Sequence, residues 1–170
     1  MKLEQFKSFF KEKETPAEKE AKKIIKNFEI NLALAIHEKN IWKAWDWLRR
    51  EGFPKAKDPK VAELVKEGVR EVLGNKIKGL ERKIKAQVPL LQEEIKDFFG
   101  IIEYFGYFLK KEDIPPEIKN SEKIKEPLEE HLRTRLGHLF TPDSFFSVSS
   151  SFFSMFFEQF EKLGLIDEET

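Results

Sequence analysis

The sequence contains no cysteine and only three histidines. Without cysteine, the chain has no disulfide bond, no thiolate ligand for a metal ion and no cysteine nucleophile. A metal site built from several histidines would need almost all of them, so we expect no bound metal. The sequence also lacks the glycine-rich phosphate loop, the dinucleotide-binding motif, the nucleophile elbow of serine hydrolases and the zinc-protease motif. We therefore expect no small-molecule cofactor and no conventional catalytic triad.

An excess of positive or negative charge is also missing, because 31 Lys and Arg residues balance 31 Asp and Glu residues. A chain without net charge is not attracted as a whole to nucleic acid or to anionic membranes, so any such binding must be local. Charged residues nevertheless make up 36% of the 170 residues, while Asn and Gln are scarce. This composition is typical of heat-adapted proteins and indicates a thermophilic source.

Long apolar segments are absent as well. The most apolar stretch, from Phe98 to Leu109, includes Glu103 and is shorter than the roughly 20 residues that a membrane-spanning helix needs. The N-terminal residues alternate charged and apolar side chains and lack the continuous apolar core of a signal peptide. We therefore expect a cytoplasmic protein with no membrane segment.

Signals for helix boundaries, in contrast, are frequent. Thr15, Pro16 and Glu18 occupy the N-cap, N1 and N3 positions of a capping box. This box predicts the start of either one long helix or a kinked pair of helices, which Gly52 and Pro54 would end.

The middle of the chain also contains signals for helix boundaries. Asp58-Pro59 is a second start signal, and it predicts a helix that ends at Gly74. A short helix is then expected around Ile77 to Ile84, where apolar residues recur at helical spacing. The segment from Pro89 to Lys111 is apolar nearly all round, which predicts a central helix surrounded by others.

Two further helices are expected toward the C-terminus. One should begin at about Ser121 or at Pro127 and end at Phe140. Ser149 is the expected N-cap of the final helix, and Gly164 is its expected end. No segment shows sustained alternation of polar and apolar residues, so strands are at most a minor addition.

The C-terminal segment contains Val148-Ser149-Ser150-Ser151-Phe152-Phe153-Ser154 and then Phe160-Glu161-Lys162-Leu163-Gly164-Leu165-Ile166. It resembles the recognition-helix region of winged helix-turn-helix regulators, whose pattern is V-S-x-S-x-V-S followed by L-E-x-x-G-L-I. Phe153 stands at the second Val position of that pattern, and Phe160 stands at its Leu position. The resemblance covers residues 141–166 and implies a helix-turn-helix-like segment in a nucleic-acid-binding protein.

The outward face of this final helix differs from that of the family. With its phenylalanines directed inward, the exposed positions are Ser150, Ser151, Ser154, Glu158 and Glu161. A helix that enters the major groove needs Arg, Lys, Asn or Gln at such positions to meet phosphates and base edges. This difference leaves two other interpretations. The segment is either an ordinary amphipathic core helix or part of a fold relative that has lost its DNA contact or makes it elsewhere.

A second motif lies upstream, where Arg133 and His138 are separated by four residues. This spacing resembles the R-N-R-L-x-H-x-Y stretch of the HEPN superfamily, all-helical proteins that include toxin ribonucleases. The resemblance implies that Arg133 binds phosphate and that His138 transfers protons during metal-independent RNA cleavage. The alternative is structural: Arg133 and Arg135 would pair with Glu129 and Glu130, and His138 would interact with the end of its own helix.

A basic stripe is the third candidate feature. Lys78, Arg82 and Lys85 recur at i, i+4 and i+7, so a helix places them on one face. If the protein contacts a phosphate backbone, we expect this stripe to be the nucleic-acid-binding surface. The alternative is a solvated helix face opposite Ile77 and Leu80.

Together these patterns predict an all-α fold, with residues 1–170 forming one compact multi-helix domain around the central apolar helix. The function they favour is a nucleic-acid-binding or protein-interaction module without catalysis that uses the basic stripe. One alternative is a HEPN-like metal-independent ribonuclease that uses Arg133 and His138. A structural subunit of a larger assembly is the other alternative.

Overall fold

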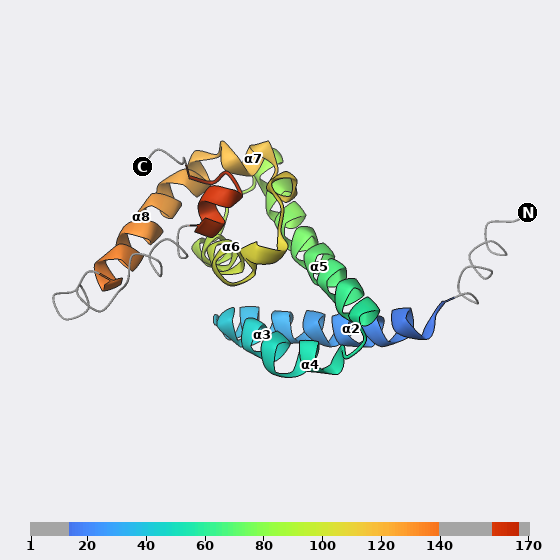
Figure 1. The fold of residues 1–170 in the computed structure, drawn as a ribbon. Helices are drawn as coiled ribbons and strands as arrows, with labels where there is room; N and C mark the ends of the chain where they lie inside the picture. The colour runs from blue at the N-terminus through green and yellow to red at the C-terminus, as the bar shows by residue number, and fades with distance from the viewer. Residues whose placement is uncertain (1–13, 140–157, 167–170) are drawn as a thin grey trace, which may run out of the picture. The chain divides into compact units, whose positions relative to one another are not determined.

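The computed structural model describes residues 14–139 and 158–166 (Figure 1). Every regular element within these residues is a helix, which confirms the predicted all-α fold. None of the described helices is both long and apolar enough to cross a membrane. The chain divides into two compact units, Met1–Val72 and Leu73–Thr170, which we call unit 1 and unit 2. The expectation of a single domain over residues 1–170 stays a prediction.

The first described helix of unit 1 is α2 (Pro16–His37), which starts where the capping box predicts. The Thr15 hydroxyl accepts a hydrogen bond of 3.1 Å from the backbone N–H of Glu18 and so satisfies one free donor of the first turn. The chain leaves this helix after His37 and turns at Lys39, whose φ is +59°. Neither predicted arrangement is observed: the long helix ends at His37, and a turn separates it from a short helix that begins at Trp42.

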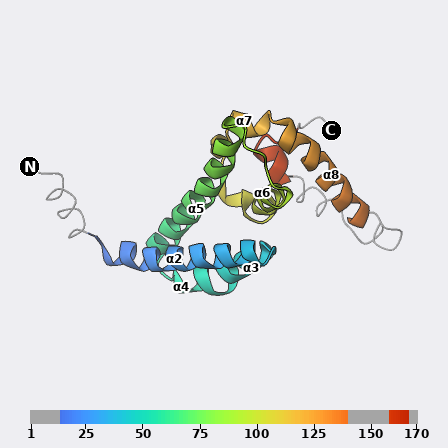
Figure 2. The ribbon, with the colours of Figure 1, turned by 180° about the vertical axis from the view of Figure 1, so that it is seen from behind.

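The short helix is α3 (Trp42–Trp47), which continues into a π-helical turn, η1 (Leu48–Gly52), and then into α4 (Phe53–Lys55). In both views α3 and α4 lie along α2 (Figures 1 and 2). The chain stays helical past Gly52, because Pro54 falls in the first turn of α4, where no N–H donor is needed.

The core of unit 1 consists mainly of small and aliphatic side chains around Phe28. The buried residues of α2 lie on one face of the helix, and they are Ala21, Ile24, Phe28, Leu32 and Ala35. The N-terminal half of α5 (Pro59–Lys85) adds Val61, Val65 and Val69 to this core. Gly68 permits a close approach of α5 to α2, because a Cβ at Gly68 would lie 2.5 Å from Cγ1 of Ile25.

The predicted end of a helix at Gly74 is wrong, because α5 runs without interruption from Pro59 to Lys85. Both Gly74 and Gly79 lie inside it, and a Cβ at either position would meet no atom within 4 Å. A glycine inside a helix costs only about 1 kcal/mol relative to alanine. Buried residues on both sides of Gly74, such as Val72 and Ile77, stabilise the continuous helix against that cost.

The core helix of unit 2 is α6 (Gln92–Phe105), which corresponds to the predicted central apolar helix. It buries Ile95, Phe98, Phe99, Ile101, Ile102 and Phe105. The 3-10 turns η2 (Gly106–Phe108) and η3 (Lys111–Asp113), the short α7 (Pro116–Lys119) and α8 (Glu122–Leu139) follow it.

Of the two predicted starts of α8, the one near Ser121 is observed, and Pro127 lies inside the helix. The last described helix covers residues 158–162, and its Phe160 is completely buried within unit 2. Gly164 ends that helix with a φ of +78°, as predicted, since glycine adopts this conformation without a steric penalty. The predicted N-cap Ser149 lies outside the described residues.

Candidate functional site

The basic stripe lies on the C-terminal half of α5, within unit 2. The side chains of Lys78, Arg82 and Lys85 are all exposed. Arg82 Nε donates a hydrogen bond of 3.4 Å to the carbonyl oxygen of Lys78, one turn earlier in the helix. Positive charge is therefore presented on successive turns of one helix face.

The two ends of the stripe differ in their acidic neighbours. Lys85 Nζ lies 3.6 Å from a carboxylate oxygen of Glu81 and 3.7 Å from one of Glu117 in α7. A hydrogen bond from its own backbone N–H and the charge of Lys85 lower the pKa of Glu117, so this carboxylate stays ionised beside the stripe. The charge of Lys85 is thus partly neutralised within the protein, whereas Lys78 and Arg82 face solvent.

Arg133 lies on the exposed surface of α8. Its Nη2 is 3.4 Å from Oε1 of Glu129, an ion pair between side chains one turn apart, with about three-quarters of each side chain exposed. Such a pair matches the structural alternative predicted for this arginine, and it leaves the guanidinium accessible to solvent. His138 belongs to α8 by its backbone, but its side chain, like that of Arg135, lies outside the described residues.

The described part of the helix-turn-helix-like segment packs against α6. Phe160 and Leu163 are fully buried. Lys162 Nζ donates to the carbonyl oxygens of Gly106 and Tyr107 at 3.4 and 3.3 Å, so it interacts with the negative end of α6. This leaves Glu158 exposed on a helix whose lysine is turned toward the protein. The remainder of the segment, residues 141–157, lies outside the described residues.

Unit 2 also contains a polar pair that sequence reasoning missed. The Nε2 atom of His131 in α8 is hydrogen-bonded to Oε1 of Glu103 in α6, and the Glu103 side chain is only 6% exposed. The imidazole ring centre lies 5.1 Å from that of Phe99 and 6.5 Å from that of Phe160. The signal was present in the sequence, because a carboxylate in an apolar helix requires a polar partner.

A pocket of about 250 Å³ lies beside this pair, between α6 and α8. The described residues of its lining are three apolar side chains and five polar or charged ones: Ile95, Phe99 and Pro127, and Gln92, Lys96, Glu130, His131 and Thr134. This lining is more polar than that of most sites for small molecules, so a ligand with polar or charged groups suits it best.

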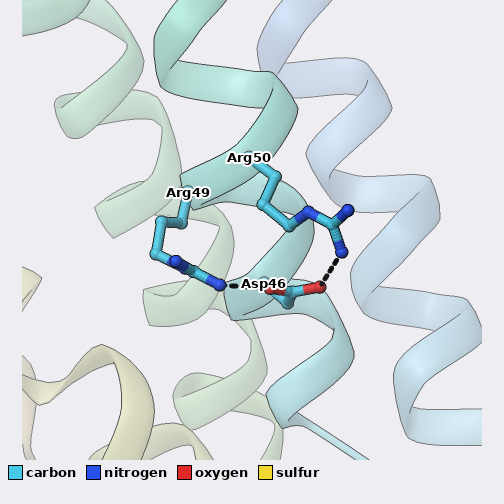
Figure 3. Close-up of polar contacts among 3 residues, drawn as sticks. All are labelled: Asp46, Arg49 and Arg50. Atoms are coloured by element: carbon cyan, nitrogen blue, oxygen red, sulfur yellow. Dashed lines mark hydrogen bonds and ion pairs between the residues drawn. The ribbon is translucent and has the colours of Figure 1, made fainter.

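Unit 1 carries its polar contacts on its surface instead. Figure 3 shows the guanidinium groups of Arg49 and Arg50 approaching the Asp46 carboxylate from either side. The oxygen–nitrogen distances are 2.7 Å to Arg49 Nη2 and 3.3 Å to Arg50 Nη1. The hydrogen bond from Arg49, with that from Arg50, lowers the pKa of Asp46. The three side chains connect α3 to the π-helical turn, and we assign them a structural role.

Comparisons with protein-family models, with curated proteins and with solved structures found no match to this chain. Within residues 14–139 and 158–166, no three histidine or acidic side chains converge in the manner of metal ligands. The basic stripe, the pocket and the exposed Arg133 are the candidate functional features of the described residues.

Proposed function

We propose that this chain is a cytoplasmic, non-catalytic binding protein that contacts the phosphate backbone of nucleic acid through the basic stripe. The observation that carries the proposal is the exposure of Lys78, Arg82 and Lys85 on one face of α5. Neighbouring cations on a helix face suit adjacent phosphates, and phosphate contacts supply most of the affinity in binding without sequence preference.

The acidic neighbours of the stripe predict an order among its residues. Because Glu81 and Glu117 lie within 4 Å of Lys85, this lysine has less free charge to offer a phosphate. Lys78 and Arg82 should therefore contribute more to binding than Lys85 does. Arg82 also offers several N–H donors in a planar group, which suits phosphate oxygens better than an ammonium group does.

The experiment is fluorescence anisotropy of the whole chain with labelled duplex DNA, single-stranded DNA and RNA, at about 50 and 200 mM salt. With two phosphate contacts, affinity should fall roughly tenfold between these salt concentrations. The double variant Lys78→Glu/Arg82→Glu should abolish binding at both. Lys85→Glu alone should weaken it less.

The matched control is Lys123→Glu/Lys125→Glu, which makes the same charge change on exposed lysines of α8. It should retain binding, since those lysines lie outside the stripe. If the two double variants lost the same amount of affinity for nucleic acid, only the net charge of the protein would matter. The stripe would then not be the binding site. Absence of binding to all three nucleic acids at the lower salt would exclude the proposed function.

The accessibility of Arg133 favours a second candidate, the metal-independent ribonuclease that uses Arg133 and His138. In that case, labelled RNA would shorten during the same titration in the presence of a chelator. Arg133→Ala and His138→Ala would each stop the cleavage without changing the anisotropy of uncleaved DNA. Intact RNA after prolonged incubation with the unaltered protein would rule this candidate out.

A further inference from the structure

The pocket between α6 and α8 carries opposite charges on its two helices. Lys96 belongs to α6 and Glu130 belongs to α8, and both line the same cavity of about 250 Å³. Across the part of the chain that the structure describes, neither side chain forms an ion pair with the other or with any other charged group. A positive and a negative group are thus both available to one molecule in the pocket.

The wall of the pocket between these charges is apolar. Ile95 and Phe99 from α6 and Pro127 from α8 contribute hydrocarbon surface. Apolar surface of this kind favours a hydrocarbon or aromatic group, since each buried CH₂ contributes to affinity. The volume lies below the roughly 300 to 1,000 Å³ of pockets for drug-sized ligands, so the matching ligand is small.

His131 adds a fixed polar group to the same pocket. Its Nε2 is hydrogen-bonded to Oε1 of Glu103, which holds the imidazole ring in place at the pocket lining. Among the described lining residues, the pocket therefore combines an imidazole with one anionic and one cationic side chain.

We propose that this pocket binds a small zwitterion, namely a free α-amino acid with an apolar side chain. Lys96 pairs with the ligand carboxylate, and Glu130 pairs with its ammonium group. The apolar side chain of the ligand packs on Ile95, Phe99 and Pro127. This binding activity is separate from nucleic-acid binding by the basic stripe, and it requires no chemical step.

The test is a titration of the isotope-labelled whole chain by NMR with three related probes. L-Phenylalanine carries both charges, L-phenylalaninamide lacks the carboxylate, and 3-phenylpropionate lacks the ammonium group. Because a hydrogen bond to a charged group contributes more than a neutral one, L-phenylalanine should bind at least about tenfold more tightly than either analogue. The shifted resonances should include those of Lys96 and Thr134.

Two variants assign the two charges separately. In Lys96→Gln, L-phenylalanine and L-phenylalaninamide should bind equally, because the carboxylate has lost its partner. In Glu130→Gln, L-phenylalanine and 3-phenylpropionate should bind equally for the corresponding reason. Lys123→Gln and Glu126→Gln, at exposed positions of α8 outside the pocket lining, are the matched controls and should retain the original preference.

Three results would overturn the proposal. They are equal binding of all three probes by the unaltered protein, an unchanged preference in both pocket variants, and binding of uracil or adenine in place of the amino acids. Failure here would be distinguishable from failure of the proposed function, because Lys78→Glu/Arg82→Glu should bind L-phenylalanine normally. Circular dichroism of each variant establishes that the helices are intact.

Discussion

The two units place their polar contacts differently. In unit 1, Asp46 pairs with Arg49 and Arg50 within one stretch of helix, and Lys43 reaches Glu38 at 2.5 Å across the preceding turn. In unit 2, His131 and Glu103 join residues 28 positions apart in the sequence, on two different helices. Contacts of the first kind stabilise a local turn, whereas contacts of the second kind determine which helix faces meet.

The cores of the two units also differ in the kind of side chain that they bury. Unit 1 buries mainly Ala, Ile, Leu and Val around Phe28, while unit 2 buries Phe98, Phe99, Phe105 and Phe160. Aromatic side chains are large and pack at restricted angles, as in the tilted pair Phe98 and Phe99 with ring centres 6.0 Å apart. The described pocket lies beside Phe99, so the unit with the larger rings and the interior polar pair is the better candidate for ligand binding.

The largest decrease in stability should come from removing the imidazole of the pair formed by His131 and Glu103. His131→Leu leaves the Glu103 carboxylate, 6% exposed, without the hydrogen bond from Nε2. We expect the free energy of unfolding to fall by about 3 kcal/mol, because a buried charge loses a partner. Urea denaturation of the two proteins measures this difference.

A matched variant in unit 1 sharpens the comparison. Lys43→Leu removes one partner of the exposed pair with Glu38, and its effect should be much smaller, because water and salt already weaken such a pair. The double variant His131→Leu/Glu103→Leu should recover part of the loss, since it removes both polar groups together. If His131→Leu and Lys43→Leu lowered the free energy of unfolding by the same amount, the polar contacts of the two units would contribute equally to stability.

The next effect concerns packing in unit 1. Gly68→Ala places a methyl group against the Ile25 side chain, so either this side chain must change its position or α5 and α2 must move apart. Overpacking of this kind costs about 1 to 3 kcal/mol, and we expect a corresponding decrease in thermal stability. Gly74→Ala, in the same helix but in open space, should instead raise stability by up to about 1 kcal/mol. Similar behaviour of the two variants in thermal melts would contradict the close approach of the two helices.

Helix starts were predictable because their signals are local. The Thr15 hydroxyl and the N–H of Glu18 are three residues apart, and no other part of the chain is needed to form their hydrogen bond. The end at Gly74 was predicted wrongly, because the cost of a helical glycine is small compared with the burial of residues on either side of it. Sequence patterns do not reveal that balance, since it depends on which side chains are finally buried.

In the candidate site, too, local features were predictable from the sequence, whereas contacts between distant residues were not. A spacing of i, i+4 and i+7 suffices to place Lys78, Arg82 and Lys85 on one face of a helix. The approach of Glu117 to Lys85 was not predictable, because α7 reaches α5 only through the fold of unit 2. The pairing of His131 with Glu103 was missed for a related reason: a carboxylate within the apolar stretch from Phe98 to Leu109 indicates that a partner exists but not which residue it is.

The smallest expected effect is a pH-dependent contribution of Asp46, in unit 1, to the stability of the protein. The arginines lower the pKa of Asp46 below its unfolded value, which is about 3.9 for an aspartate. A carboxyl group with a lowered pKa contributes stability that is present above the unfolded value and is lost as the pH falls through the folded value. Asp46→Asn should therefore lower the melting temperature slightly at neutral pH, and the difference from the unaltered protein should vanish as the pH falls through the lowered pKa of Asp46. A difference of the same size at neutral pH and in strong acid would show that the variant acts through the helix and not through the charge.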